Sequence, residues 1–181
     1  MSYYYFIATL PMLGFNSPPP MDLVRFRELC SEALSNSDFS TLTSLLDGGE
    51  SGNRFVKEWR NCDTQICNAV ARQRAIRLGT AADAAKWIRP QTGIEVFIDN
   101  AVAAAFQEAD PMARELALAR LRWTKLEDTA GFNNFSLSYI LAYSIKLEIL
   151  NMIVSADFDK GSERLRGIVH TEAQDNGLKQ F

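Results

Sequence analysis

The sequence has 181 residues, of which 47% are hydrophobic and 23% charged, with 19 Lys and Arg against 22 Asp and Glu. This length and apolar content fit one globular domain and exclude an intrinsically disordered chain. The formal net charge of -3 supplies no overall attraction toward nucleic acid or an anionic membrane.

The start and stop residues of the predicted helices can be read along the chain. Asp22, Asp110 and Ser136 each precede an apolar periodic stretch and can cap its free backbone N–H groups. Pro111 suits the first position of a helix, and Gly79 suits the residue after the last turn. Together with the three- and four-residue spacing of apolar side chains, these residues predict helices over about 22–35, 38–46, 53–78, 81–88, 94–108, 110–129, 136–155 and 159–172.

The first ten residues do not follow this pattern. The aromatic residues and Ile7 within Tyr3–Leu10 favour a strand, but the only other strand-like run, Ile94–Ile98, continues into a helical pattern. We therefore expect an all-α fold, a multi-helix bundle of about two related units. The predicted organisation is one helical domain over 1–173, divisible into units of 1–90 and 91–173, followed by a polar tail over 174–181.

Two apolar stretches raise the question of membrane insertion. Residues 1–10 lack the basic residues and cleavage site of a signal peptide, so we expect them in the mature protein. Residues 137–154 contain Lys146, Glu148 and Asn151, which favour a buried helix over a membrane span.

The cysteines indicate a reducing compartment. Cys30, Cys62 and Cys67 are an odd number of thiols in a chain long enough to fold without disulfides, so we expect free thiols in the core. Cys62 and Cys67 lie five residues apart on one predicted helix, and no second pair completes a zinc site.

The sequence contains no motif that predicts catalysis or cofactor binding. It has neither a G-x-x-x-x-G-K-[ST] loop nor a G-x-G-x-x-G turn, so no phosphate site is expected. The sole histidine, His170, lies in a polar stretch, and Asp157 and Asp159 lack the further oxygen ligands of an EF-hand loop. We therefore expect no enzyme activity, no metal and no cofactor.

A short pattern occurs twice. Gln65-Ile-Cys-Asn68 and Glu148-Ile-Leu-Asn151 each lie inside a long apolar helix. A buried Asn must find hydrogen-bond partners, so the two copies suggest a duplicated unit in which Asn68 and Asn151 fix contacts between helices. Chance similarity over so few residues is the alternative interpretation.

Charged residues on two helices are candidates for a partner interface. Arg72, Arg74 and Arg77 give the end of the long helix a basic face that could dock an acidic partner. The alternative is a solvated face favoured by the helix dipole. Lys146 and Glu148 lie two residues apart in the most apolar helix, so they cannot both point into one core. Either each of them pairs with another element, or that helix has one face open to a protein partner.

A resemblance rests on five stretches of the sequence: residues 4–13, the segment from Phe55–Trp59 to Asn68–Arg72, Asp110–Glu115, Leu121–Trp123 and Leu141–Leu150. Over about residues 3 to 170, the chain resembles an uncharacterised bacterial family whose genes lie in operons for V-type (archaeal-type) rotary ATPases. That family looks like a shortened relative of the ATPase component that is named C in bacteria and archaea and d in eukaryotes. The helical units of this component include a Glu-x-x-Asn string. Glu148 to Asn151 match the string, and Gln65 to Asn68 match it with Gln in place of Glu.

The resemblance implies a non-catalytic subunit or accessory factor of a V-type ATPase. Its partners would be the central-stalk and rotor-ring subunits, with no nucleic acid, and its location would be cytoplasmic, peripheral to the inner membrane through the ATPase. The full-length component has three helical units, whereas 181 residues suffice for about two. The alternative is a helical adaptor or regulatory module unrelated to the ATPase, with the basic helix as its docking face.

Overall fold

The computed structural model describes residues 3–156, which form seven α-helices and one 3-10 helix. The all-α prediction is confirmed for this part of the chain. The helix expected over about 159–172, together with His170, Asp157, Asp159 and the tail over 174–181, lies outside the described residues. In chain order the elements are α1 (Tyr4–Thr9), α2 (Leu23–Ala33), α3 (Asn36–Leu46), α4 (Arg54–Arg77), η1 (Ala81–Trp87), α5 (Val96–Ala105), α6 (Pro111–Ala130) and α7 (Leu137–Ser155).

The predicted helix ends form as expected. The side chains of Asp22, Asp110 and Ser136 accept hydrogen bonds from backbone N–H groups in the first turns of α2, α6 and α7, at 2.7, 3.1 and 3.4 Å. Gly79 follows α4 with φ of 70°, a conformation that side chains with a Cβ atom rarely adopt. These local signals set where the long helices begin and end.

The N-terminal segment is helical, and the strand favoured by its composition is wrong. Residues 4–9 form α1, which buries Ile7, while the backbone N–H of Tyr3 donates to the carbonyl of Phe135 at 3.0 Å. No strand lies within residues 3–156 to pair with this segment. An isolated strand leaves its backbone groups unpaired, whereas a helix satisfies them within the segment.

The short alanine-rich segment after Gly79 is a 3-10 helix rather than an α-helix. It runs from Ala81 to Trp87 and buries none of its residues. Gly79 and Pro90 limit its length, and 3-10 turns are typical of such short connections.

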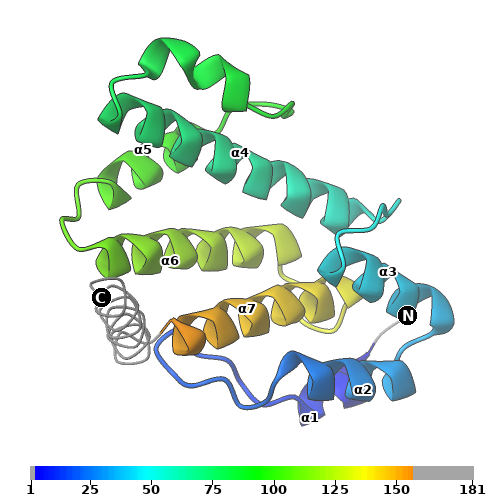
Figure 1. Ribbon diagram of the computed structural model, residues 1–181. Helices are drawn as coiled ribbons and strands as arrows, with labels where there is room; N and C mark the ends of the chain where they lie inside the picture. Colours follow the sequence, from blue (N-terminus) through cyan, green and yellow to red (C-terminus); the bar gives the residue numbers. More distant parts are fainter. Residues whose placement is uncertain (1–2, 157–181) are drawn as a thin grey trace, which may run out of the picture.

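The middle of the bundle is α6, which packs against α4 on one side and α7 on the other (Figure 1). Two apolar clusters fill the interior. The first joins α1 to α3, the start of α4, part of α6 and α7, with Phe26, Leu126 and Leu147 fully buried. The second joins the rest of α4, α5 and part of α6, around Ile66 and Ile98. Each cluster contains residues from before and after residue 90. A division of the chain at residue 90 therefore does not assign one cluster to each unit.

Within residues 3–156, α7 is the one helix long and apolar enough to cross a membrane, with a mean hydropathy of 1.4. Half of that stretch is buried inside the structure. α7 packs against α2, α3, α4 and α6, so its apolar composition serves the core of the bundle (Figure 1).

Candidate functional site

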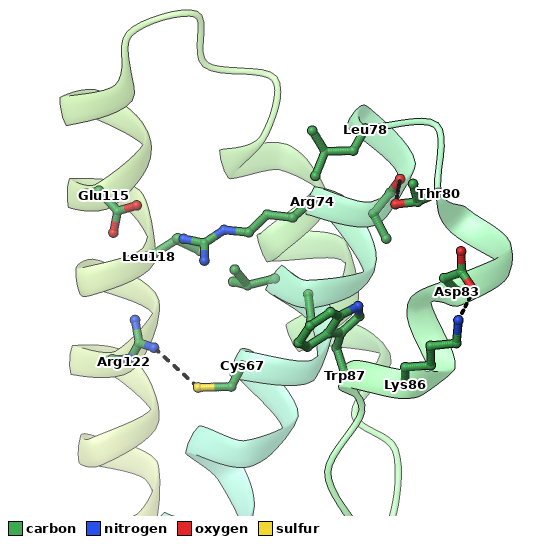
Figure 2. Close-up of a pocket in the computed structure, with 13 residues that line it drawn as sticks. Cys67, Arg74, Leu78, Thr80, Asp83, Lys86, Trp87, Glu115, Leu118 and Arg122 are labelled. Carbon is green, nitrogen blue, oxygen red and sulfur yellow. Dashed lines mark hydrogen bonds and ion pairs between the residues drawn. The ribbon is translucent and has the colours of Figure 1, made fainter.

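A groove of about 670 Å³ lies between α4, η1 and α6, and it is called the α4–α6 groove below. Figure 2 shows its lining side chains. The apolar part is formed by Val70, Ala71, Ala75, Leu78, Trp87 and Leu118, and the polar part by Cys67, Arg74, Thr80, Asp83, Lys86, Glu115 and Arg122. A concave, mainly apolar surface with a few polar groups is typical of a binding site.

The end of α4 creates one wall of this groove. The backbone N–H of Thr80 donates to the carbonyl of Ala75 at 2.9 Å, so the chain reverses at Gly79 and η1 packs back against α4. η1 buries none of its own residues, and Trp87 is 71% exposed at the groove. A large aromatic side chain held at the surface is a common anchor for a partner.

Polar side chains on α4 hold the segment that follows η1. Asn68 is 1% exposed; its amide donates to the carbonyl of Arg89 at 2.8 Å, and its oxygen accepts from the N–H of Arg89 at 2.9 Å. Gln65 donates to the carbonyl of Thr92 at 3.1 Å and accepts from the N–H of Glu95 at 3.0 Å. Asn68 therefore fixes a helix to a connecting segment rather than to another helix.

Asn61 belongs to the same network but was not singled out from the sequence. Its side chain donates to the carbonyl of Thr92 at 2.8 Å and accepts from the N–H of Thr92 at 2.7 Å. Asn61, Gln65 and Asn68 follow one another at four- and three-residue steps, which places them on one face of α4. The spacing of these three amide side chains in the sequence is the signal from which the network could have been predicted.

Asn151, the counterpart of Asn68 in the repeated pattern, has a different environment. Its amide donates to the carbonyl of Leu147 in its own helix at 2.9 Å, and its side chain is half-buried. Glu148 is exposed, whereas its counterpart Gln65 is buried. Among the described residues the two copies of the pattern thus make different contacts.

The three arginines at the end of α4 do not form one open face. Arg72 pairs with Asp99 on α5, and the guanidinium of Arg77 donates to the carbonyl of Phe106 and lies 5.1 Å from the centre of its ring. Arg74 is exposed and extends from α4 toward α6 (Figure 2). Of the three, only Arg74 lines the groove.

The α6 wall carries charges of both signs. Arg122 donates to Asp63 at 2.9 Å and lies 3.9 Å from the sulfur of Cys67. Burial lowers the pKa of Arg122, but the attraction of Asp63 outweighs it and holds that pKa above its usual value. Glu115, near the start of α6, is exposed. Its carboxylate and the Arg74 guanidinium lie on different walls of the groove (Figure 2).

Lys146 and Glu148 point to different neighbours on α7. The Lys146 ammonium lies 2.7 Å from the Glu127 carboxylate on α6 and 4.7 Å from the centre of the Trp123 ring. Glu148 reaches the surface, but the surrounding protein displaces part of the water around its carboxylate. This desolvation raises the pKa of Glu148, and the positive charge of Arg27 partly offsets the rise. Lys146 therefore contributes to helix packing, while Glu148 stays at the surface.

A second apolar surface lies at the other end of α6, where the chain turns into α7. It consists of exposed side chains on α1 and the two nearby connections; we call it the aromatic surface. The rings of Tyr4 and Phe135 lie 4.8 Å apart, and those of Tyr4 and Tyr5 lie 5.6 Å apart. Its exposed members are Tyr4, Tyr5, Met12, Phe132 and Phe135.

The cysteines have no disulfide partners. Burial raises the pKa of Cys30 to about 12 and that of Cys62 to about 11, so both thiols are unreactive core groups. Cys67 is half-buried and lines the groove. In residues 3–156 no group of three or more His, Cys, Asp and Glu side chains is placed to hold a metal ion.

Comparison with known proteins gives one family match. Residues 93–175 match the sequence model of a family described as "Protein of unknown function (DUF2764)". No curated protein and no solved structure matches the chain. The matched region includes α5, α6 and α7, and the family description names no activity.

Proposed function

We infer that this chain is a non-catalytic subunit or accessory factor of a V-type rotary ATPase, linking the central stalk to the membrane rotor ring. The observation that carries this proposal is the presence of two separate apolar surfaces on one helical bundle. A protein that links two bodies needs two such surfaces. Large exposed apolar side chains gathered in one place are typical of protein interfaces.

The two surfaces lie at opposite ends of α6, which gives them a fixed separation. Leu118 lies in the α4–α6 groove, and Phe132 belongs to the aromatic surface just after the end of α6. From Leu118 to Ala130, the last residue of α6, the helix rises about 18 Å at 1.5 Å per residue. α6 packs against α4 and α5 on one side and α7 on the other, which supports a fixed spacing between the two surfaces.

The resemblance of the sequence supports the choice of partner. Segments of α1, α4, α6 and α7 resemble the family encoded with V-type ATPases, and an all-helical fold agrees with a relative of the component named C or d. The mechanism would be mechanical, with torque carried through helix-packed contacts. The location would be cytoplasmic and peripheral to the inner membrane, through contacts with the ATPase.

Affinity purification of the tagged chain from its native cells in mild detergent, followed by mass spectrometry, tests this proposal. We expect V-type ATPase stalk and rotor subunits in a fixed ratio. Recovery of other proteins without ATPase subunits would contradict the proposal and favour an adaptor acting elsewhere.

Variants of the two surfaces sharpen the test. Trp87→Asp in the groove and Phe132→Asp on the aromatic surface should each lose some ATPase subunits and keep others, because each surface serves one partner. Val24→Asp, at an exposed position of α2 that belongs to neither surface, is the matched control and should change nothing. Equal recovery of all subunits by the three variants would exclude these surfaces as the interface.

A further inference from the structure

The aromatic surface is built from two segments that contain no charged residue. Residues 1–21 and 129–145 have no Asp, Glu, Lys or Arg, although 23% of the whole chain is charged. The structure brings the two segments together. The backbone N–H of Tyr3 donates to the carbonyl of Phe135 at 3.0 Å, and the hydroxyl of Tyr143 donates to the carbonyl of Pro11 at 2.9 Å. The exposed side chains of this surface therefore come from adjoining segments without charge.

Several apolar side chains of this surface protrude from the protein. Phe132, Met12 and Tyr5 are 105%, 94% and 87% exposed, so the rest of the chain covers almost none of their area. The side chains that dominate binding between proteins fill matching pockets of the partner. The fluid boundary between lipid head groups and acyl chains, in contrast, takes up protruding apolar groups without preformed pockets. Protruding side chains therefore favour a lipid surface as the partner.

Both segments pair backbone groups internally. Residues 4–9 do so as the helix α1. In the connection from α6 to α7, the N–H of Phe135 donates to the side-chain oxygen of Asn133 at 3.1 Å, and the N–H of Ser136 donates to the carbonyl of Asn133 at 3.3 Å. Backbone groups that are already paired lose less when they leave water, which happens where a segment enters a bilayer.

The chemistry around the surface indicates the kind of lipid. The two tyrosines of α1 combine an apolar ring with a hydroxyl group, and such side chains are enriched where a bilayer meets water. The charged residues that flank the two segments in the sequence, or whose side chains bond to them, are Asp22, Asp128, Lys146, Arg120 and Asp38. Three of these are acidic and two are basic. Attraction to anionic lipid needs a cluster of basic residues, so these charges favour zwitterionic lipid.

We propose that the aromatic surface binds a lipid bilayer, with its apolar side chains inserted at the level of the head groups and with no requirement for anionic lipid. The inference goes beyond the proposed function and does not depend on it, because the chain alone would bind the lipid. The two are compatible, since a membrane rotor ring is surrounded by a bilayer.

Flotation of the purified full-length chain with phosphatidylcholine vesicles tests this proposal. We expect the chain to float with the vesicles and Phe132→Asp to lower the partition coefficient by at least about tenfold, because a charged side chain is costly in a bilayer. Phe132 is fully exposed, so this change should leave the fold intact, as circular dichroism will show. Phe132→Trp should keep the binding. Val24→Asp places the same charge at an exposed position of α2 outside the aromatic surface, and it should float like the native chain.

Two further measurements separate apolar insertion from other forms of association. Raising the salt concentration from about 0.1 to about 1 M should not weaken the binding, whereas attraction between charges would be screened. Analytical ultracentrifugation of the chain without lipid shows whether the surface joins two copies of the chain instead. The proposal would be overturned by a chain that does not float, by equal flotation of Phe132→Asp, or by binding that needs anionic lipid and is lost in high salt. A dimer that depends on Phe132, together with no flotation, would assign the surface to a second copy.

Discussion

Asn68 joins α4 to the segment that follows η1. It is nearly fully buried and satisfies both the N–H and the carbonyl of Arg89. Asn68→Ala leaves these two backbone groups without partners, so we expect it to lower the free energy of unfolding by about 3 kcal/mol. Urea denaturation followed by circular dichroism measures this change.

Asn151→Ala is the control for that prediction. Asn151 is half-buried and bonds to the carbonyl of Leu147, which already belongs to the α7 helix. Its loss should cost less than about 1 kcal/mol. Equal costs at the two positions would mean that the repeated pattern has one structural role in both helices.

Glu148 should make stability depend on pH. Desolvation raises its pKa in the folded protein, so the folded state binds the proton more tightly than the unfolded chain does. Stability is then lost as the pH rises from about 4.3, the ordinary pKa of Glu, through the raised value. We expect Glu148→Gln to stabilise the protein at pH 7 and to have little effect near pH 4, measured by urea denaturation at both values. Destabilisation at pH 7 would instead show that the carboxylate has a net favourable contact with Arg27.

At the scale of the elements, the junction between α6 and α7 depends on one glycine. Gly131 has φ of 70° and ψ of -166°, a conformation that is essentially restricted to glycine. A Cβ atom there would meet nothing within 4 Å, so the cost of Gly131→Ala would come from the backbone alone. We expect a loss of about 2 kcal/mol in the free energy of unfolding, measured by urea denaturation.

Gly52→Ala is the matched control, because a Cβ atom at Gly52 also meets nothing and its φ lies outside the left-handed region. This change should be neutral or slightly stabilising. A similar loss at both glycines would contradict the backbone explanation for Gly131.

The sequence predicts helix ends well because their signals are local. Asp22, Asp110 and Ser136 cap the helices that they precede, and these contacts lie within one turn of chain. The α1 segment was harder to assign, because aromatic residues that favour strands in general form a helix where no strand is available. In the α1 segment, the need to pair backbone N–H and carbonyl groups overrides the strand propensity of the side chains.

The candidate site could not be predicted because its parts are far apart in the sequence. Trp87 and Leu118 meet at the groove only after α4, η1 and α6 have packed. The internal partners of Arg72 and Arg77 likewise come from α5 and the residue after it. Arg74 was among the residues singled out, but the pattern of arginines alone does not separate it from the other two.

At the scale of the whole molecule, we propose that the bundle links two parts of a rotary ATPase through the groove and the aromatic surface. The most direct measurement is binding of the purified full-length chain to purified central-stalk subunits and to the isolated rotor ring, followed by native mass spectrometry. We expect a complex with each at fixed stoichiometry, and a ternary complex when both are present. Binding to neither would contradict it.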